Sequence, residues 1–490
     1  MRNNQEFADR IDSGRPARAP VPAQAPAQAP AQAQVAARET VYAVSSGAGR
    51  AGVAVVRLSG AGAGAALAAL AGSLPPPRRA TLARLRDPAG GKTIDRGLVL
   101  WFPGPGSFTG EDVAELHVHG GRAVLAATLQ ALGRIPGLRP AEAGEFTRRA
   151  FDNGKLDLSE AEGLADLIDA ETEAQRHQAV RQLGGALSRL TDGWRERLVA
   201  ALAHLEATID FADEDLAPNA DPSAISVAVG HNILCLNEEI TQYIGESHRG
   251  ERLRRGLSVA IVGAPNVGKS SLLNALARRD AAIVSDVAGT TRDVIEVHLD
   301  LQGYPVSLAD TAGLHDGTGV DDRHAPVEAE GMRRARAQAA AADLTVAVFD
   351  IRQAQNPDPD TLALVNADTV VVLNKQDLAD GDGPIELGGR PTVSVSAKTG
   401  AGMAALEVVL GKEASERLAV SGESPLFTRA RHRQALVDCA AALERAAAAP
   451  LAELAAEDVR LAVRALGRIA GRVDVEDVLG VIFRDFCIGK

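Results

Sequence analysis

The residues with the clearest chemical purpose lie between Gly263 and Ser270, which read Gly-Ala-Pro-Asn-Val-Gly-Lys-Ser. This octapeptide fits the pattern G-x-x-x-x-G-K-[ST], in which successive backbone N–H groups point into one concavity that accepts phosphate oxygens. Glycine lets the backbone come close to a phosphate, and Lys269 supplies the opposite charge. The apolar segment 257–262 predicts a strand before this loop, and the leucine spacing in 271–278 predicts a helix after it. The order of strand, loop and helix is the one that a nucleotide-binding α/β domain requires.

Three later segments indicate which nucleotide is bound. Residues 306–309 predict a strand that ends in Asp310-Thr-Ala-Gly, and a carboxylate there can hold Mg²⁺ through water. Residues 369–373 predict a buried strand that ends in Asn374-Lys-Gln-Asp. The carboxylate of Asp377 can accept two hydrogen bonds from the N1–H and N2–H₂ edge of guanine, a donor pair that adenine lacks. A third strand, followed by Ser-Ala-Lys at 396–398, predicts a loop against the base, so the sequence predicts a GTPase domain.

The segment 285–293 lies between the phosphate-binding loop and Asp310, where this fold carries a threonine onto Mg²⁺ and the γ-phosphate. We expect Thr291 to be that ligand and Ser270 to be the other protein ligand of Mg²⁺. Ras-like enzymes position the attacking water with a glutamine, but Leu314 stands at that place and has no polar group. The hydrolytic apparatus must therefore differ, and the Asn266 amide is a candidate ligand for a monovalent cation that does the work of an arginine.

The expected GTP-binding residues share one property, which is that they lie in the loops following these predicted strands. They are Asn266, Val267, Gly268, Lys269, Ser270, Ser271, Ser285, Asp286, Val287, Ala288, Gly289, Thr290, Thr291, Asp310, Thr311, Ala312, Gly313, Asn374, Lys375, Gln376, Asp377, Ser396, Ala397 and Lys398.

The elements around these loops predict a multidomain protein of mixed α/β and α class. Residues 1–38 are rich in alanine, proline and glutamine and predict a disordered extension. Residues 39–154 mix strands and helices, and 155–251 are helical, with an apolar stripe from Leu183 to Leu205. The GTPase domain occupies 252–418, and a similar helical pattern resumes over 419–490. We therefore expect one helical domain interrupted by an inserted GTPase domain with a parallel, Ras-like sheet.

Composition excludes some classes of protein. The net charge of −12 argues against a protein that coats nucleic acid by charge alone, and the runs at Arg252–Arg255 and Arg333–Arg336 are typical of solvated helix faces. No apolar run reaches the length of a membrane span. The three cysteines, Cys235, Cys439 and Cys487, are too few and too widely spaced for a disulfide framework. These features predict a cytoplasmic protein.

Several segments outside the GTPase domain carry a resemblance. They are Val53–Gly60 (VAVVRLSG), Ser107–Glu115 (SFTGEDVAE), His119–Gly121, Gly144–Thr147, Ala150–Leu158 (AFDNGKLDL), Ile209–Phe211 and the terminal Cys487–Lys490 (CIGK), with Gly289–Asp293 (GTTRD) inside it. In this combination, which spans residues 39–490, the chain resembles the TrmE-type family of bacterial tRNA-modification GTPases.

The resemblance implies a particular activity. An N-terminal folate-binding-like domain would dimerise and bind a tetrahydrofolate one-carbon derivative at Arg57, Glu115, Lys155 and Lys490. With a FAD-dependent partner, MnmG (GidA), the homodimer would add a carboxymethylaminomethyl group at C5 of the wobble uridine of certain tRNAs, with FAD bound only by the partner. Hydrolysis of GTP would be activated by K⁺.

The resemblance also places the K⁺ site and the catalytic residue. The K⁺ ligands would be Asn266, Ser285, Val287 and Thr290. The catalytic glutamate that orients water would be Glu328, with Glu330 as the other candidate because the segment 317–325 is longer than is typical. An alternative of another kind is an Era-like ribosome-assembly GTPase without modification chemistry, but such proteins lack the N-terminal module.

Overall fold

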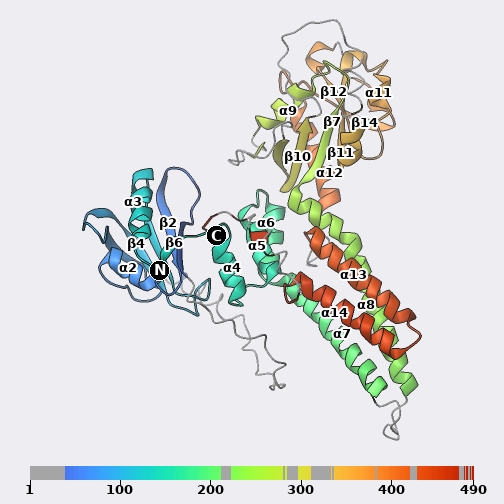
Figure 1. Cartoon of the computed structure of the whole chain (residues 1–490). Helices are drawn as coiled ribbons and strands as arrows, with labels where there is room; N and C mark the ends of the chain where they lie inside the picture. The colour runs from blue at the N-terminus through green and yellow to red at the C-terminus, as the bar shows by residue number, and fades with distance from the viewer. Residues whose placement is uncertain are drawn as a thin grey trace, which may run out of the picture. The chain divides into compact units, whose positions relative to one another are not determined.

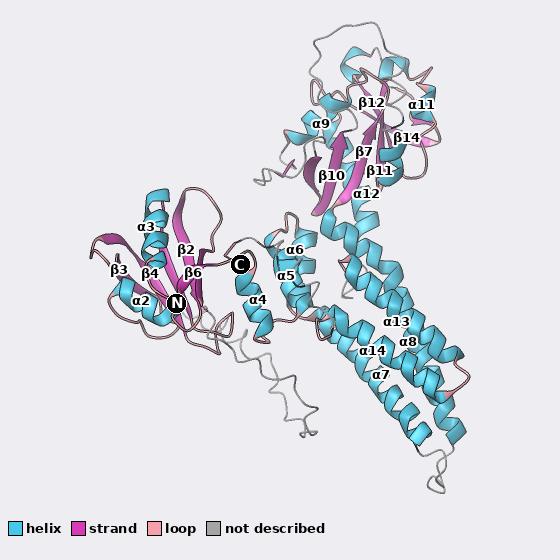
Figure 2. Ribbon diagram, in the orientation of Figure 1, coloured by secondary structure: helices cyan, strands magenta, loops and turns pink. Residues whose placement is uncertain are grey.

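The computed structural model describes residues 39–210, 222–279, 282–283, 296–310, 333, 336–379, 381, 383–419, 427–473, 479, 482–483, 486 and 488–489. The contacts within the chain divide it into two units. The first comprises residues up to 107 and 111–140, and the second comprises 108–110 and 141 onward. Figure 1 labels the elements of both units, and Figure 2 shows that the second unit contains long helices as well as a sheet.

The first unit is an α+β domain built on one sheet in the order β3-β4-β5-β2-β1-β6. Its strands are β1 (Thr40–Val44), β2 (Ala51–Ser59), β3 (Thr81–Arg86), β4 (Thr93–Phe102), β5 (Val113–Gly120) and β6 (Leu138–Pro140). All neighbouring strands are antiparallel except β1 and β6. The helices α2 (Ala63–Ala71) and α3 (Arg122–Gly133) share one apolar core with the strands, to which Leu67, Leu116 and Leu132 contribute fully buried side chains.

The second unit begins with three short helices, α4 (Glu145–Asp152), α5 (Leu158–Ile168) and α6 (Glu173–Leu183). Helix α5 starts at a capping box, in which Asp157 accepts a hydrogen bond from the backbone of Glu160 and the Glu160 side chain accepts one from the backbone of Asp157. Helix α6 ends before Gly184 and Gly185, and the apolar stripe that we predicted from Leu183 to Leu205 is thereby divided between α6 and α7.

Four long helices come from both sides of the GTPase insertion. They are α7 (Ala186–Asp210), α8 (Pro222–Arg255), α13 (Ala430–Ala448) and α14 (Ala452–Ile469). One core joins them, with Leu198 from α7, Ile240 from α8, Leu443 from α13 and Val459 from α14. This shared core confirms the prediction of a helical domain interrupted by an insertion.

The insertion folds around a sheet in the order β13-β14-β12-β11-β7-β10-β9-β8. Its strands are β7 (Leu257–Val262), β8 (Ala282–Ile283), β9 (Glu296–Leu301), β10 (Tyr304–Asp310), β11 (Leu344–Asp350), β12 (Thr369–Asn374), β13 (Glu386–Leu387) and β14 (Arg390–Ser394). The strands β14, β12, β11, β7 and β10 run parallel, as predicted. Helices α9 (Lys269–Ala277) and α12 (Met403–Leu418) share the core on one face, and α11 (Pro359–Leu362) lies nearer the other.

The parallel strands place their carboxyl ends at one edge of the sheet, which is where the predicted loops lie. In register, Ala347 of β11 pairs with Val262 of β7, and Asp350 of β11 pairs with Asn374 of β12. The loops after β7, β11 and β12 are therefore neighbours, as ligand sites in parallel α/β sheets require.

The expected boundary of the first domain at residue 154 differs from the division by contacts. Helix α4 belongs to the second unit, whose continuous part begins at Ala141. The core beside α5 explains this, because Phe151 at the end of α4 packs with Leu158, Phe483 and Phe486. Across the described residues, no helix has the length and apolar composition needed to cross a lipid bilayer.

Candidate nucleotide-binding site

The phosphate-binding loop connects β7 to α9, as the sequence predicted, and its two glycines are required by their surroundings. Gly268 has a φ of +97°, and a Cβ there would lie 2.3 Å from the side-chain nitrogen of Asn374. Gly263 has a φ of +156°, and a Cβ there would lie 2.5 Å from the carbonyl oxygen of Val348. L-residues other than glycine rarely adopt such positive φ values, so both steric space and backbone conformation select glycine.

The Lys269 ammonium is folded over this loop. Its Nζ donates hydrogen bonds to the carbonyl oxygens of Gly263 (2.9 Å) and Ala264 (3.0 Å). A cation held at the concave side of a loop of backbone N–H groups favours a phosphate, which is the chemistry predicted for this lysine.

Asn374 joins the base-recognition loop to two neighbouring loops. Its Nδ2 donates to the carbonyl oxygen of Val267 at 2.9 Å, and its Oδ1 accepts from the backbone N–H of Ala397 at 3.1 Å. The side chain is buried, and a buried amide that makes both kinds of hydrogen bond is held in one orientation. The first residue of the predicted Asn-Lys-Gln-Asp motif therefore organises the site.

Asp377 is the residue expected to select guanine, and its carboxylate is already oriented. The Ser396 hydroxyl donates to Asp377 Oδ1 at 2.6 Å, while the rest of the aspartate is exposed. Ser396 itself is fully buried. The second carboxylate oxygen can therefore face a ligand while the first is held by the protein.

Lys375 connects the base-recognition loop to the phosphate-binding loop. Its Nζ donates to the carbonyl oxygen of Asn266 at 2.6 Å and forms an ion pair with Asp350 at 3.0 Å. Both Asn266 and Lys375 have positive φ values, of 64° and 67°. Such conformations persist where surrounding contacts hold them.

Asp350 was not among the expected site residues. Its side chain is only 5% exposed and also forms an ion pair with Arg352 at 2.6 Å. The hydrogen bonds from Arg352 and then Lys375 hold the pKa of Asp350 well below its usual range, although partial burial opposes them. The signal that identified Asp310, an aspartate at the carboxyl end of an apolar strand, is equally present at Phe349-Asp350.

Other residues that are expected to contact the nucleotide lie in the same loops. Gln376 donates its backbone N–H to the carbonyl oxygen of Val395, and Lys398 is exposed in the loop after β14. Ser270 and Ser271 lie in the first turn of α9.

Several expected residues lie outside the part of the chain that the structure describes. They are Ser285, Asp286, Val287, Ala288, Gly289, Thr290, Thr291, Thr311, Ala312, Gly313, Leu314, Glu328, Glu330, Cys487 and Lys490. The expected catalytic residue, the threonine ligand of Mg²⁺ and three of the four expected K⁺ ligands are among them.

The residue types at this edge of the sheet suit Mg²⁺. Asp310 ends β10, where it pairs in register with Ile261 of the neighbouring β7, and Ser270 is the second residue of α9, which follows the loop after β7. A hydroxyl and a carboxylate are hard oxygen donors of the kind that Mg²⁺ prefers. Asn266, the described member of the expected K⁺ ligands, is exposed at the same edge.

Two of the expected folate-contacting residues lie together in the first unit. Arg57 of β2 is opposite Glu115 of β5, and Arg57 Nη2 forms an ion pair with Glu115 Oε1 at 3.1 Å. His117 Nε2 lies 3.1 Å from the other carboxylate oxygen of Glu115. Lys155 follows α4 in the second unit.

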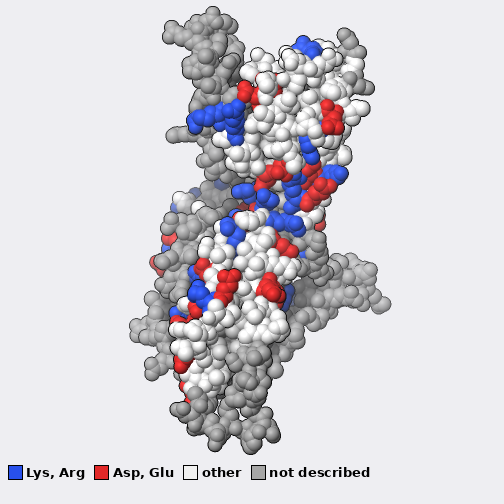
Figure 3. All heavy atoms as spheres, turned by 90° about the vertical axis from the view of Figure 1, so that its right-hand side faces the viewer, with Lys and Arg blue, Asp and Glu red and all other residues white. Residues whose placement is uncertain are grey.

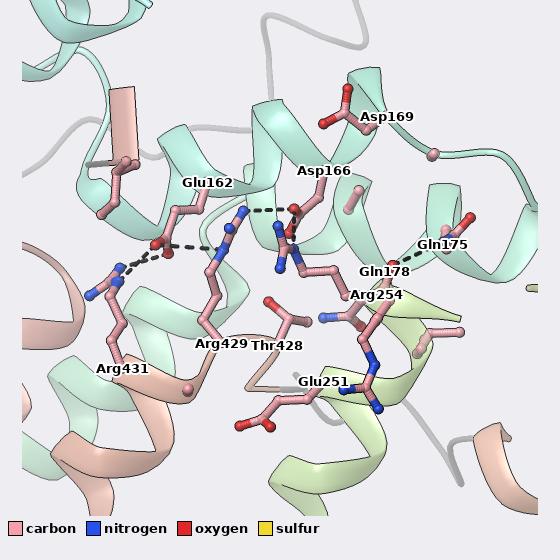
Figure 4. A pocket seen from close by; sticks show the side chains of 16 residues that line it. Glu162, Asp166, Asp169, Gln175, Gln178, Glu251, Arg254, Thr428, Arg429 and Arg431 are labelled. Atoms are coloured by element: carbon pink, nitrogen blue, oxygen red, sulfur yellow. Dashed lines mark hydrogen bonds and ion pairs between the residues drawn. The ribbon is translucent and has the colours of Figure 1, made fainter. Parts of the chain in front are cut away.

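A second charged site lies among α5, α8 and α13 beside a cavity of about 650 Å³ (Figure 4). Asp166 Oδ1 of α5 accepts from Arg254 Nε at 2.9 Å and from Arg429 Nη2 at 2.7 Å. Arg254 lies at the end of α8, just before the inserted domain, and Arg429 precedes α13, just after it. One carboxylate therefore binds both chain segments that flank the insertion.

One turn earlier on α5, Glu162 is completely buried and accepts hydrogen bonds from two further side chains. It accepts from Arg431 Nε and Nη2 at 2.7 and 2.6 Å, and from His432 Nε2 at 2.9 Å. Burial raises the pKa of Glu162, but His432 and Arg431 outweigh it and hold that pKa well below its usual range. Burial lowers the pKa of His432.

The arginine run at the end of α8 is also paired. Arg252 and Arg255 form ion pairs with Asp343 at 2.6 and 3.6 Å, and all three arginines of the run are 42–69% exposed. Figure 3 shows basic and acidic side chains interspersed around the middle of the face that it draws. The three arginine side chains are therefore exposed, as we predicted for a solvated helix face, and each guanidinium also has an acidic partner.

The fold and the site define a P-loop nucleotide-binding domain with a guanine-recognition loop, inserted into a helical domain that follows an α+β domain. The sequence model of the MnmE helical domain matches residues 158–487, and the model described as GTP-binding protein TrmE N-terminus matches residues 40–155. The chain therefore belongs to the MnmE (TrmE) family.

Curated relatives agree over nearly the whole chain. A Rhodospirillum rubrum protein is 57% identical over 465 residues, which cover 92% of this chain and 99% of the relative. A Paramagnetospirillum magneticum protein is 57% identical over 453 residues, which cover 92% and 100%, and one from Parvibaculum lavamentivorans is 56% identical over 461 residues, which cover 92% and 100%. Each of the three is named tRNA modification GTPase MnmE.

Proposed function

We propose that this protein hydrolyses GTP as part of the modification of tRNA. The arrangement of the three loops supports the hydrolysis of GTP. Asn374 bonds to the phosphate-binding loop, and Asp377 presents a carboxylate at the position expected to recognise guanine. Relatives that are 52–57% identical are named tRNA modification GTPases, which supports the role in tRNA modification.

We further propose the family's chemistry for this chain. Together with the FAD-dependent protein MnmG, a homodimer would add a carboxymethylaminomethyl group at C5 of the wobble uridine of certain tRNAs in the cytoplasm. A tetrahydrofolate derivative would bind near Arg57 and Glu115, with Lys155 and Lys490 as the further contacts. The paired strands β2 and β5 support this proposal, because they present a guanidinium and a carboxylate side by side.

Hydrolysis needs two ions and one carboxylate. Mg²⁺, held by Ser270 and Thr291, would neutralise charge on the β- and γ-phosphates. Asn266 would help to hold K⁺ beside the phosphates, together with Ser285, Val287 and Thr290. Glu328 would orient the attacking water, a role that Leu314 lacks the polar group to fill.

The first experiment tests hydrolysis in the purified full-length chain. We expect GTPase activity that rises in K⁺ but not in Na⁺, and we expect Asn266→Ala to remove this dependence. Equal rates in the two salts would refute the proposed cation site. Glu328→Ala should abolish hydrolysis and keep GTP affinity, whereas the same effect from Glu330→Ala would move the catalytic role to that residue.

The second experiment tests tRNA modification. Nucleosides of tRNA from a strain that lacks this protein should have lost the modified wobble uridine, and expression of the wild-type chain should restore it. Intact wobble uridine together with immature ribosomes would instead support the Era-like alternative. The match of residues 40–155 to the TrmE N-terminus weighs against that alternative.

A further inference from the structure

We propose that Asp350 is a positioning residue of the nucleotide site, which holds the Lys375 ammonium against the Asn266 carbonyl and so couples base recognition to the phosphate-binding loop. This inference rests on the proposed GTP site, to which it adds a residue that neither sequence motif contains.

The position of Asp350 follows from the sheet. It is the last residue of β11, the fully buried strand that lies between β7 and β12. The phosphate-binding loop follows β7, and the Asn-Lys-Gln-Asp motif follows β12. A side chain at the end of β11 is therefore beside both loops, and Asp350 pairs in register with Asn374.

The contacts of Asp350 are directed and charged. Oδ2 accepts from Arg352 Nη2 at 2.6 Å and from Lys375 Nζ at 3.0 Å, while Oδ1 accepts from Arg352 Nε at 3.0 Å and from the Arg352 backbone N–H at 3.1 Å. Hydrogen bonds between ionised partners are shorter and stronger than neutral ones, and a carboxylate that is 5% exposed is only weakly screened. Arg352 therefore fixes the carboxylate, and the carboxylate fixes the lysine.

Lys375 transmits this order to the phosphate-binding loop. The same Nζ donates to the carbonyl oxygen of Asn266 at 2.6 Å, so one ammonium bridges a side chain of β11 and the backbone of the loop. Without Asp350, a flexible four-carbon side chain would regain rotamer freedom that nucleotide binding must then remove. Removal of Asp350 would therefore weaken the binding of nucleotide in the ground state and would not slow the chemical step.

The test measures nucleotide affinity with fluorescent mant-GDP and mant-GTP on the purified full-length chain. We expect Asp350→Asn to weaken binding about tenfold, equivalent to about 1.4 kcal/mol. The KM for GTP should rise by a similar factor while kcat stays within threefold, because binding common to the ground and transition states is lost. Asp350→Glu, which keeps the charge, should recover most of the affinity.

A double-mutant cycle tests whether Asp350 acts through Lys375. If Asp350 acts through Lys375, then Asp350→Asn should cost little further affinity in a Lys375→Met background. Asp360→Asn is the matched control, because it breaks an exposed ion pair with Arg336 in the same domain and should leave affinity unchanged.

Four outcomes are decisive. Unchanged affinity in Asp350→Asn, or a full additional tenfold loss in the Lys375→Met background, would overturn the proposed role. If Asp350→Asn does not fold, the nucleotide affinity of Asp350→Glu is measured instead, and it must stay within threefold of the wild-type affinity. A wild-type chain that binds neither nucleotide would instead overturn the proposed GTP site itself.

Discussion

The buried carboxylate of Glu162 offers the sharpest test of what holds the helical domain together. Glu162 is 0% exposed and accepts hydrogen bonds from Arg431 and His432, with Arg429 Nε at 3.6 Å. Replacement by glutamine keeps the shape but removes the charge. The Arg431 guanidinium would then keep its hydrogen bonds to the carbonyl oxygens of Arg468 and Ile469 but lose its carboxylate, whereas Arg429 would stay bonded to Asp166.

The expected magnitude follows from this geometry. Breaking a buried ion pair by removing one partner costs about 3–5 kcal/mol, because a charge remains buried without compensation. The glutamine carbonyl keeps one acceptor for Arg431, which places Glu162→Gln at the lower end. We therefore expect a loss of about 3 kcal/mol in the free energy of unfolding of the helical domain.

The two tryptophans make this measurable. Trp101 belongs to the first unit, whereas Trp194 lies in the helical core, where it stacks on Phe427 with ring centroids 6.1 Å apart. In a Trp101→Phe background, Trp194 fluorescence during urea unfolding reports the helical domain. Asp192→Asn is the control, since its ion pair with Arg472 is 32–44% exposed and should contribute less than about 1 kcal/mol. A loss below about 1 kcal/mol in Glu162→Gln would refute the reasoning.

Three further outcomes are expected. Gly268→Ala should abolish nucleotide binding in a filter or fluorescence assay while circular dichroism stays unchanged, because its Cβ would meet the side chain of Asn374 at 2.3 Å. Both Glu162 and His432 have folded-state pKa values below their ordinary values of 4.5 and 6.5, so the unfolded chain binds protons more strongly than the folded chain. Unfolding followed by Trp fluorescence should therefore show a free energy of unfolding that falls below about pH 6.5 and falls more steeply below about pH 4.5. A free energy of unfolding that rises on acidification would contradict this prediction. Burial raises the pKa of Cys439 to about 12, so in a chain whose other cysteines are serines iodoacetamide should label it at pH 8 only after unfolding.

Motifs that combine composition with strict spacing predicted the strands of the GTPase domain and the loops that follow them. The loops at 263–270 and 374–377 both follow apolar strands, and both lie at the same edge of the sheet, as predicted. Asp350 has the same local signal as Asp310, an aspartate at the end of an apolar strand, but its role depends on β11 lying between β7 and β12, an order that no local pattern contains.

Periodicity predicted the helices but not their ends or partners. The stripe from Leu183 continues into α7, but Gly184 and Gly185 separate two helices within it. Leu461 fits the apolar spacing of α14 and is nevertheless 40% exposed, because the bundle covers only part of each helix. The acidic partners of the α8 arginines are equally non-local, since Asp166 and Asp343 lie about 90 residues away in opposite directions.

The interrupted helical core has a consequence for the order in which a ribosome can complete this protein. Helices α7 and α8 expose apolar faces that α13 and α14 cover, yet α8 ends at Arg255 and α13 begins only at Ala430. At roughly 5–20 residues per second, translation of the intervening segment takes on the order of ten to thirty seconds. By the end of that interval the nascent GTPase domain has all its described strands, whereas its helical host still lacks the two helices that complete its core.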